Sequence, residues 1–138
     1  MNYLDSSVLL RWLLDEPGQL DPATVTQPIT SALAEVEIFR TLDRLRLRSN
    51  TFTPEILADL HARAHDLLAR IQLVQVSSPI LARAAQPFTT PLRTLDALHL
   101  ATALLWREQH PGGLYELATH DQELGLAARA SGFAVQGL

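Results

Sequence analysis

The sequence contains no cysteine and no lysine, and it has no long uninterrupted apolar run. The lack of cysteine excludes disulfide bonds and thiolate metal sites. No stretch reaches the roughly 18 apolar residues that a membrane-spanning helix needs, so we expect no membrane segment. The N-terminus lacks the basic segment of a signal peptide, and Asp5 and Arg11 interrupt its apolar residues. Together these absences favour a cytoplasmic protein.

All 11 basic residues are arginine, against 15 acidic residues, and the net charge is -4. An acidic balance disfavours a broad basic surface for nucleic acid. The objection weakens if four of the acids surround bound cations, since 15 - 4 leaves 11 acids against 11 arginines. Arginine is also the better bidentate ligand for phosphate. The overall charge therefore leaves a contact with nucleic acid open.

Length and hydropathy predict a single globular domain over residues 1–138, with 47% hydrophobic residues and a mean hydropathy of +0.07. Short apolar segments that resemble strands alternate with helical patterns. We expect strands at residues 2–4, 28–30, 73–76, 115–119 and 133–135. We expect helices at residues 8–14 (capped by Ser6 or Ser7), 31–48, 54–71, 79–85, 95–108 and 122–131. This alternation predicts an α/β fold, a three-layer α/β/α sandwich with a mostly parallel central sheet.

Four acidic residues occupy positions where such a sheet gathers its ligands, at the carboxyl ends of the strands. Asp5 directly follows the first expected strand, and Asp121 follows the strand at 115–119. Asp96 lies in the first turn of an apolar helix, and Glu37 lies inside the helix that starts near Ser31. Each acid alone has an ordinary explanation, as a helix cap, a dipole partner or a surface ion-pair member.

The combination of four acids favours a metal site. Four carboxylates at one edge of a sheet would repel one another unless a cation lay among them. Mg²⁺ and Mn²⁺ prefer oxygen ligands. Such an ion can activate water and stabilise charge on a phosphoryl group.

Four stretches, YLDSSVLL, ITSALAEVEIFRTL, TLDALHLATAL and LATHDQELGLAARASGF, resemble the PIN-domain ribonucleases of the VapC toxin type. Their order and spacing fit that family from end to end. The resemblance implies a PIN-like fold, a metal-dependent endoribonuclease that leaves a 5′-phosphate and a 3′-hydroxyl, a cognate antitoxin and a homodimer. It assigns catalysis and binding of Mg²⁺ or Mn²⁺ to Asp5, Glu37, Asp96 and Asp121. It gives supporting roles to Ser6 and Thr119.

The sequence departs from the family pattern in two places. Residues 15–28 are short and broken by proline where the family usually has more helix. His120 stands where relatives often have arginine. One assignment also has a competitor, because Glu35 lies two residues before Glu37. The two side chains are about 200° apart on a helix, so only one can face the site. The resemblance favours Glu37.

Several other residues have two interpretations. The helix of Glu37 carries an arginine stripe on one side that could contact RNA phosphates or face solvent, formed by Arg40, Arg44 and Arg48. His99 could support the site or pack in the core. His61 and His65 lack the glutamate of a zinc-protease motif and are expected at the surface. Trp12 and Trp106 are expected in the core or at a subunit interface.

Two functional alternatives stay open: an RNA-processing PIN nuclease outside any toxin system, and a PIN-like binding protein without catalysis. A phosphorylation receiver domain is disfavoured because it needs an acidic pair after the first strand and a lysine. A P-loop is excluded by the lack of lysine.

Overall fold

The structure is a computed structural model that describes residues 1–113 and 116–138. Its centre is a five-stranded sheet in the order β3-β2-β1-β4-β5, in which all four pairings are parallel. The strands are β1 (Asn2–Leu4), β2 (Pro28–Ser31), β3 (Gln72–Val74), β4 (Glu116–Ala118) and β5 (Ala134–Gln136). The expected start of the fourth strand at Tyr115 lies outside the described residues.

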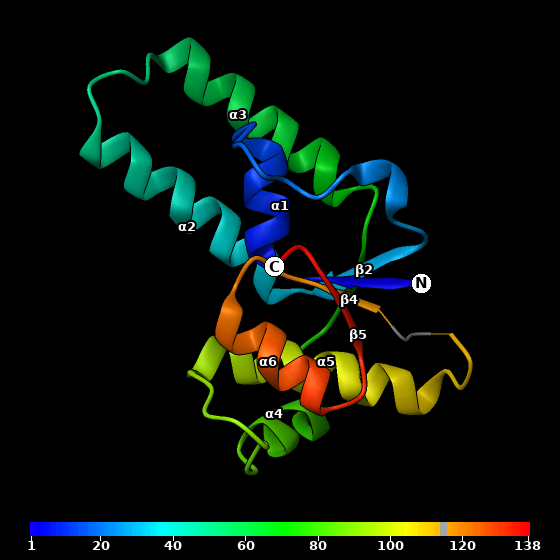
Figure 1. Cartoon of the computed structure of the whole chain (residues 1–138). Helices are drawn as coiled ribbons and strands as arrows, with labels where there is room; N and C mark the ends of the chain where they lie inside the picture. The colour runs from blue at the N-terminus through cyan, green and yellow to red at the C-terminus, as the bar shows by residue number, and fades with distance from the viewer. Residues whose placement is uncertain (114–115) are drawn as a thin grey trace.

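Helices cover both faces of the sheet (Figure 1). The helices are α1 (Ser6–Leu13), α2 (Leu33–Arg48), α3 (Pro54–Leu68), α4 (Ser78–Ala84), α5 (Thr94–Gln109) and α6 (Gln122–Ala130). Figure 1 shows α1, α2 and α3 on one side, and α4, α5 and α6 on the other. The predicted three-layer α/β/α sandwich is therefore confirmed.

The layers follow from the period of two along each strand, which sends successive side chains to opposite faces. On β1, Leu4 packs with the core of α1, α2 and α3, whereas Tyr3 packs with the core of α5 and α6. On β4, Ala118 and Leu117 divide in the same way. All four side chains are fully buried. The central strands are apolar on both faces because both faces are covered.

The strand order sets the position of the site. From β1 the chain adds β2 and β3 on one side, and β4 and β5 then lie on the other side of β1. The order therefore reverses between β1 and β4, and ligands of open α/β sheets bind outside the carboxyl ends of strands at such a switch point. Asp5 follows β1 at this point, and Thr119 follows β4.

Several boundaries differ from the predictions, and three of the differences concern the ends of the first three helices. Asp5, not Ser6 or Ser7, is the N-cap of α1. The second helix starts at Leu33 because Ser31 belongs to β2, where it pairs with Val74. The third helix ends at Leu68, before the expected residue 71. Residues 15–27 form a loop with one short 3-10 helix (η1, Pro22–Thr24), in agreement with the prolines of this segment, and Pro28 begins β2.

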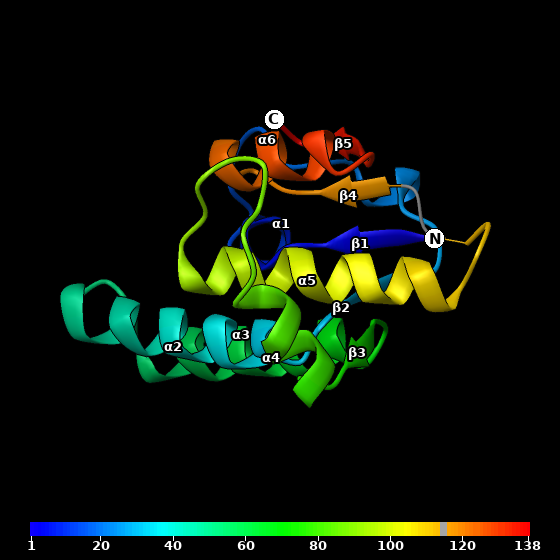
Figure 2. The ribbon, with the colours of Figure 1, turned by 90° about the horizontal axis from the view of Figure 1, so that it is seen from below.

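The antiparallel pair α2 and α3 extends past the end of the sheet as an arm (Figure 2). Among the helices of residues 1–113 and 116–138, none has the length and apolarity to cross a bilayer.

Candidate active site

Asp5 lies at the junction of β1 and α1 and is 4% exposed. Its amide donates to the Ala118 carbonyl of β4 at 2.9 Å, which fixes it at the switch point. Its Oδ2 accepts hydrogen bonds from the hydroxyls of Ser7 at 2.6 Å and Thr119 at 2.9 Å. The two hydroxyls hold this oxygen in place, and the carboxylate stands at the open end of the sheet.

Glu37 comes from α2 and points toward Asp5. Its Oε2 accepts from the Ser6 hydroxyl at 3.1 Å, and its Oε1 lies 2.6 Å from Nε2 of His99. The same His99 nitrogen lies 3.7 Å from Oδ1 of Asp5. Glu35, by contrast, is exposed to solvent. The structure thus places Glu37, and not Glu35, beside Asp5.

Asp96 and Asp121 complete the group from the N-terminal ends of α5 and α6. Asp121 is the N-cap of α6 and accepts from the Leu124 amide at 2.9 Å. The hydroxyl of Thr119 accepts from the Asp121 amide at 2.9 Å, so this one residue contacts two of the acids. The guanidinium of Arg93 lies 3.8 Å from both Asp96 and Asp121. These contacts bring all four predicted acids into one region.

The acids influence one another electrostatically. The pKa of Asp96 is raised to about 6, first by burial and then by the negative charges of Asp121 and Asp5, while Arg93 acts in the opposite direction. Burial works to lower the pKa of His99, but the hydrogen bond to Glu37 and the neighbouring carboxylates outweigh burial and raise it. Accumulated negative charge is therefore unfavourable in this region, and a cation would stabilise it.

The donor chemistry of this region fits Mg²⁺ or Mn²⁺, since it offers carboxylate oxygens near buried hydroxyls. The side chains are not arranged as a finished ligand set: within residues 1–113 and 116–138, no three acidic or histidine side chains are grouped to hold one ion. Each carboxylate is instead turned to a protein partner, either a hydroxyl, His99 or Arg93.

Two contributors to the region were not predicted from the sequence. Ser7 donates to Asp5 and accepts from the amide of His120 at 3.0 Å. Arg93 stands three residues before Asp96, a spacing that indicates proximity on a starting helix. The ring of His120 turns away from the acids, with Nδ1 bonded to the Gly137 carbonyl at 2.5 Å.

The arginine stripe begins next to the acids. A groove of about 340 Å³ is lined by Ser6, Leu10, Glu37, Arg40, Arg44 and Leu95, among others. Arg40 pairs with Asp43 at 3.1 Å and is largely exposed. Arg48 is the last residue of α2, in the arm and farther from Glu37. The first two arginines therefore border the acidic region directly.

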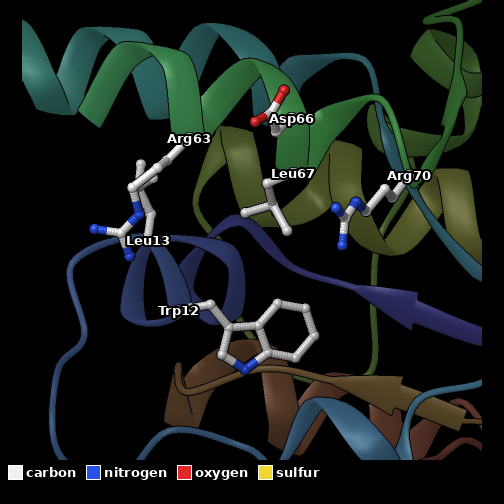
Figure 3. Close-up of a pocket in the computed structure, with 6 residues that line it drawn as sticks. All are labelled: Trp12, Leu13, Arg63, Asp66, Leu67 and Arg70. Carbon is white, nitrogen blue, oxygen red and sulfur yellow. The ribbon is translucent and has the colours of Figure 1, made fainter. Parts of the chain in front are cut away.

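A separate pocket of about 240 Å³ lies between α1 and α3. Figure 3 shows Trp12 facing Leu67 across it, with Arg63 and Arg70 on either side. Trp12 packs against the core and donates from Nε1 to the Leu20 carbonyl at 2.6 Å. It lies near the end of α1 opposite Asp5, so this pocket is distinct from the acidic region.

Trp106, His61 and His65 all pack against other aromatic rings. Trp106 is half-buried against the second core and stacks on His110, with 4.1 Å between ring centroids. His61 and His65 both contact Phe39 of α2, at centroid distances of 5.7 Å and 4.9 Å. His65 is exposed as predicted, whereas His61 is half-buried. Both histidines thus join α3 to α2.

Comparisons with known proteins agree with this geometry. The profile of the PIN-domain family matches residues 3–128. The chain is 34% identical over 141 residues to "Ribonuclease VapC35" of Mycobacterium tuberculosis, which covers 98% of this chain and 95% of that protein. It is also 34% identical to "Ribonuclease VapC46" of the same species, over 96% of this chain and 94% of that one. A solved toxin–antitoxin complex from Klebsiella pneumoniae contains a similar chain, with a TM-score of 0.61, 21% identity and 89% coverage of both chains, and supports the fold.

Proposed function

The chain belongs to the PIN-domain family, and on that premise we propose that it is a divalent-metal-dependent endoribonuclease, the toxin of a VapBC-type toxin–antitoxin pair. The observation that supports the proposal is that Ser6, Thr119, His99 and Arg93 link Asp5, Glu37, Asp96 and Asp121 in one region at the switch point of the sheet. The carboxylates repel one another, and a bound cation would relieve this repulsion and could also bind the phosphate group of a phosphodiester substrate.

Asp5, Glu37 and Asp96 would hold one Mg²⁺ or Mn²⁺, and Asp121 would complete the site or help to bind a second ion. A bound ion supplies an activated water and positive charge beside the phosphoryl oxygens. Side chains of the protein hold the carboxylates in position. Thr119 and Ser7 hold Oδ2 of Asp5, and Ser6 holds Oε2 of Glu37, so neither carboxylate rotates freely.

The substrate we propose is RNA, bound along the groove beside Glu37. Arg40 and Arg44 line that groove next to the acids and would contact phosphates on one side of the cleaved bond. Arg48 would extend the same stripe along α2. Arg93 is exposed over 78% of its side chain and stands between Asp96 and Asp121, so it can move to a phosphate when a cation replaces it.

The partner we propose is a cognate antitoxin that covers the acidic region and inserts a basic side chain among the four carboxylates. The contacts of Arg93 support this chemistry, because they show that a guanidinium reaches the acids. We also place the protein in the cytoplasm and expect a homodimer. An RNA-processing PIN nuclease without an antitoxin would share the same acids, and only the partner distinguishes the two.

The test is cleavage of single-stranded and structured RNA with Mg²⁺ or Mn²⁺, comparing wild type with Asp5→Asn and Asp96→Asn. We expect wild type to cut and both variants to lose at least about 100-fold in rate, since each removes a metal ligand. Activity that disappears with EDTA and returns with Mn²⁺ is the second expected result. Equal cleavage by all three proteins would contradict the proposal.

A further inference from the structure

His99 is a fully buried histidine within the apolar face of α5, one turn after Asp96. Both of its ring nitrogens have partners. Nε2 lies 2.6 Å from Oε1 of Glu37, and Nδ1 lies 2.8 Å from the Tyr3 hydroxyl. Tyr3 also packs edge-on against the imidazole, with 6.0 Å between ring centroids. The ring is therefore fixed at both ends.

The hydrogen bonds have one consistent direction. The Tyr3 hydroxyl accepts from the amide of Ser31 at 3.2 Å, and Tyr3 keeps its proton because burial and the nearby carboxylates raise its pKa well above the usual range. That proton can then be donated to Nδ1 of a neutral His99. The imidazole proton consequently sits on Nε2 and is donated to Glu37. A doubly protonated ring donates to Glu37 from the same nitrogen.

A role in packing alone explains these contacts poorly. An apolar side chain would fill the space without burying two polar ring atoms that both need hydrogen-bond partners. The contact restrains Glu37, whose side chain is about one-fifth exposed and whose other hydrogen bond, within the part of the chain that the structure describes, is to Ser6. The same nitrogen lies 3.7 Å from Asp5, so His99 stands between two of the acids.

We infer that Tyr3 and His99 are positioning residues, a hydrogen-bonded pair that orients the Glu37 carboxylate and thereby sets the metal affinity of the acidic region. The inference rests on the proposed function for the identity of the ligands. The donor for the inward-facing Glu37 carboxylate comes from α5, across the end of the sheet. The pair touches neither RNA nor the reacting atoms.

The first test needs no metal and no substrate. Nitrogen-15 NMR of the metal-free protein in alkaline buffer, where the ring is neutral, reports which nitrogen carries the proton. We expect the proton on Nε2 of His99 in wild type and in Tyr3→Phe, because the Glu37 carboxylate at Nε2 can only accept, and a mixture of the two forms in Glu37→Ala. A proton on Nδ1 in wild type would overturn the inference, whatever the activity of the protein.

The second test measures Mn²⁺ affinity by calorimetry for His99→Leu, His99→Gln and Tyr3→Phe. Loss of a group that orients a ligand typically costs about 10- to 100-fold in metal affinity, which we expect for His99→Leu. Tyr3→Phe should cost less, and His99→Gln should recover part of the loss because its amide can donate to Glu37. His65→Gln is the matched control on α3 and should bind as wild type. Thermal melts confirm that each variant is folded.

A double-mutant cycle separates positioning from general damage. If His99 acts through Glu37, His99→Leu should weaken Mn²⁺ binding in the wild-type background and have almost no further effect in Glu37→Ala. An equal loss in both backgrounds would overturn the inference. Wild type that binds no Mn²⁺ and cuts no RNA would instead count against the proposed function, and the NMR result would still decide the tautomer.

Discussion

At the residue scale, Asp5 combines two roles in one carboxylate. Its Oδ2 accepts from the amide of Ser7 at 3.4 Å as the N-cap of α1, and it also accepts from two hydroxyls of the acidic region. Asparagine caps helices about as well as aspartate. Asp5→Asn therefore removes the charge and leaves the start of α1 largely intact, so a loss of activity in this variant reports the site and not the fold.

Asp96 makes the stability of the metal-free protein depend on pH. Its pKa is raised from 3.8 in an ordinary setting to about 6 in the folded protein, first by burial and then by Asp121 and Asp5. The folded state thus holds this proton more tightly than the unfolded chain. The resulting stability is present below about pH 4 and is lost as the pH rises to about 6.

As the pH rises from about 4 to about 6, we expect the free energy of unfolding of Asp96→Asn to increase relative to that of wild type by on the order of 1 kcal/mol. This figure allows for solvent screening of Asp96. The measurement is urea unfolding in EDTA at several pH values, with the difference between the two proteins as the readout. Parallel curves would contradict the prediction. Saturating Mg²⁺ should remove the disadvantage of wild type at about pH 8, because the cation offsets the same repulsion.

The sequence places Asp5, Asp96 and Asp121 next to predicted element boundaries and Glu37 inside a predicted helix, and their role as metal ligands stays a prediction. It does not resolve how they are held. The hydrogen-bond partner of Glu37 is His99, which is 62 residues away along the chain and is brought near only when α5 packs on the sheet. Arg93 is similar, since its contact with Asp121 joins the starts of two helices.

At the scale of the elements, helix starts were predicted with mixed success for a physical reason. Thr53 followed by Pro54 is a local signal, and α3 begins at Pro54. The start of α2 was misplaced because Ser31 pairs with Val74 in the sheet, and that pairing depends on a strand 40 residues later. Local hydrogen bonds can be predicted from the sequence, whereas pairing between distant segments decides which local option is used.

Two N-caps give a matched test of this local chemistry. Thr53 accepts from the Ile56 amide at 3.2 Å through its hydroxyl, whereas Ser77, the N-cap of α4, makes no such side-chain bond. Thr53→Ala should lower the free energy of unfolding by about 1 kcal/mol, and Ser77→Ala should change it by less than about 0.5 kcal/mol. Urea unfolding measures both. Equal effects would mean that the cap bond of Thr53 contributes nothing.

At the scale of the whole molecule, the sheet and its two helical layers follow from the alternation of strands and helices, and the sequence predicts them. The arm of α2 and α3 is less expected, because it extends beyond the sheet that it covers (Figure 2). The arm exposes large apolar side chains, with Leu47 at 69% and Ile56 at 44% of their surface. Such side chains are typical of a surface that a second protein covers.

We expect the chain to form a homodimer through this arm, since a two-fold contact can cover the same apolar residues on both copies. Leu47→Asp combined with Ile56→Asp should shift the protein to a monomer, because charges in the contact would be buried without partners. Leu126→Asp is the control, an exposed leucine on α6 outside the arm. Light scattering after size-exclusion chromatography gives the mass of each. A dimer that survives the double substitution but not Leu126→Asp would place the interface on α6 instead.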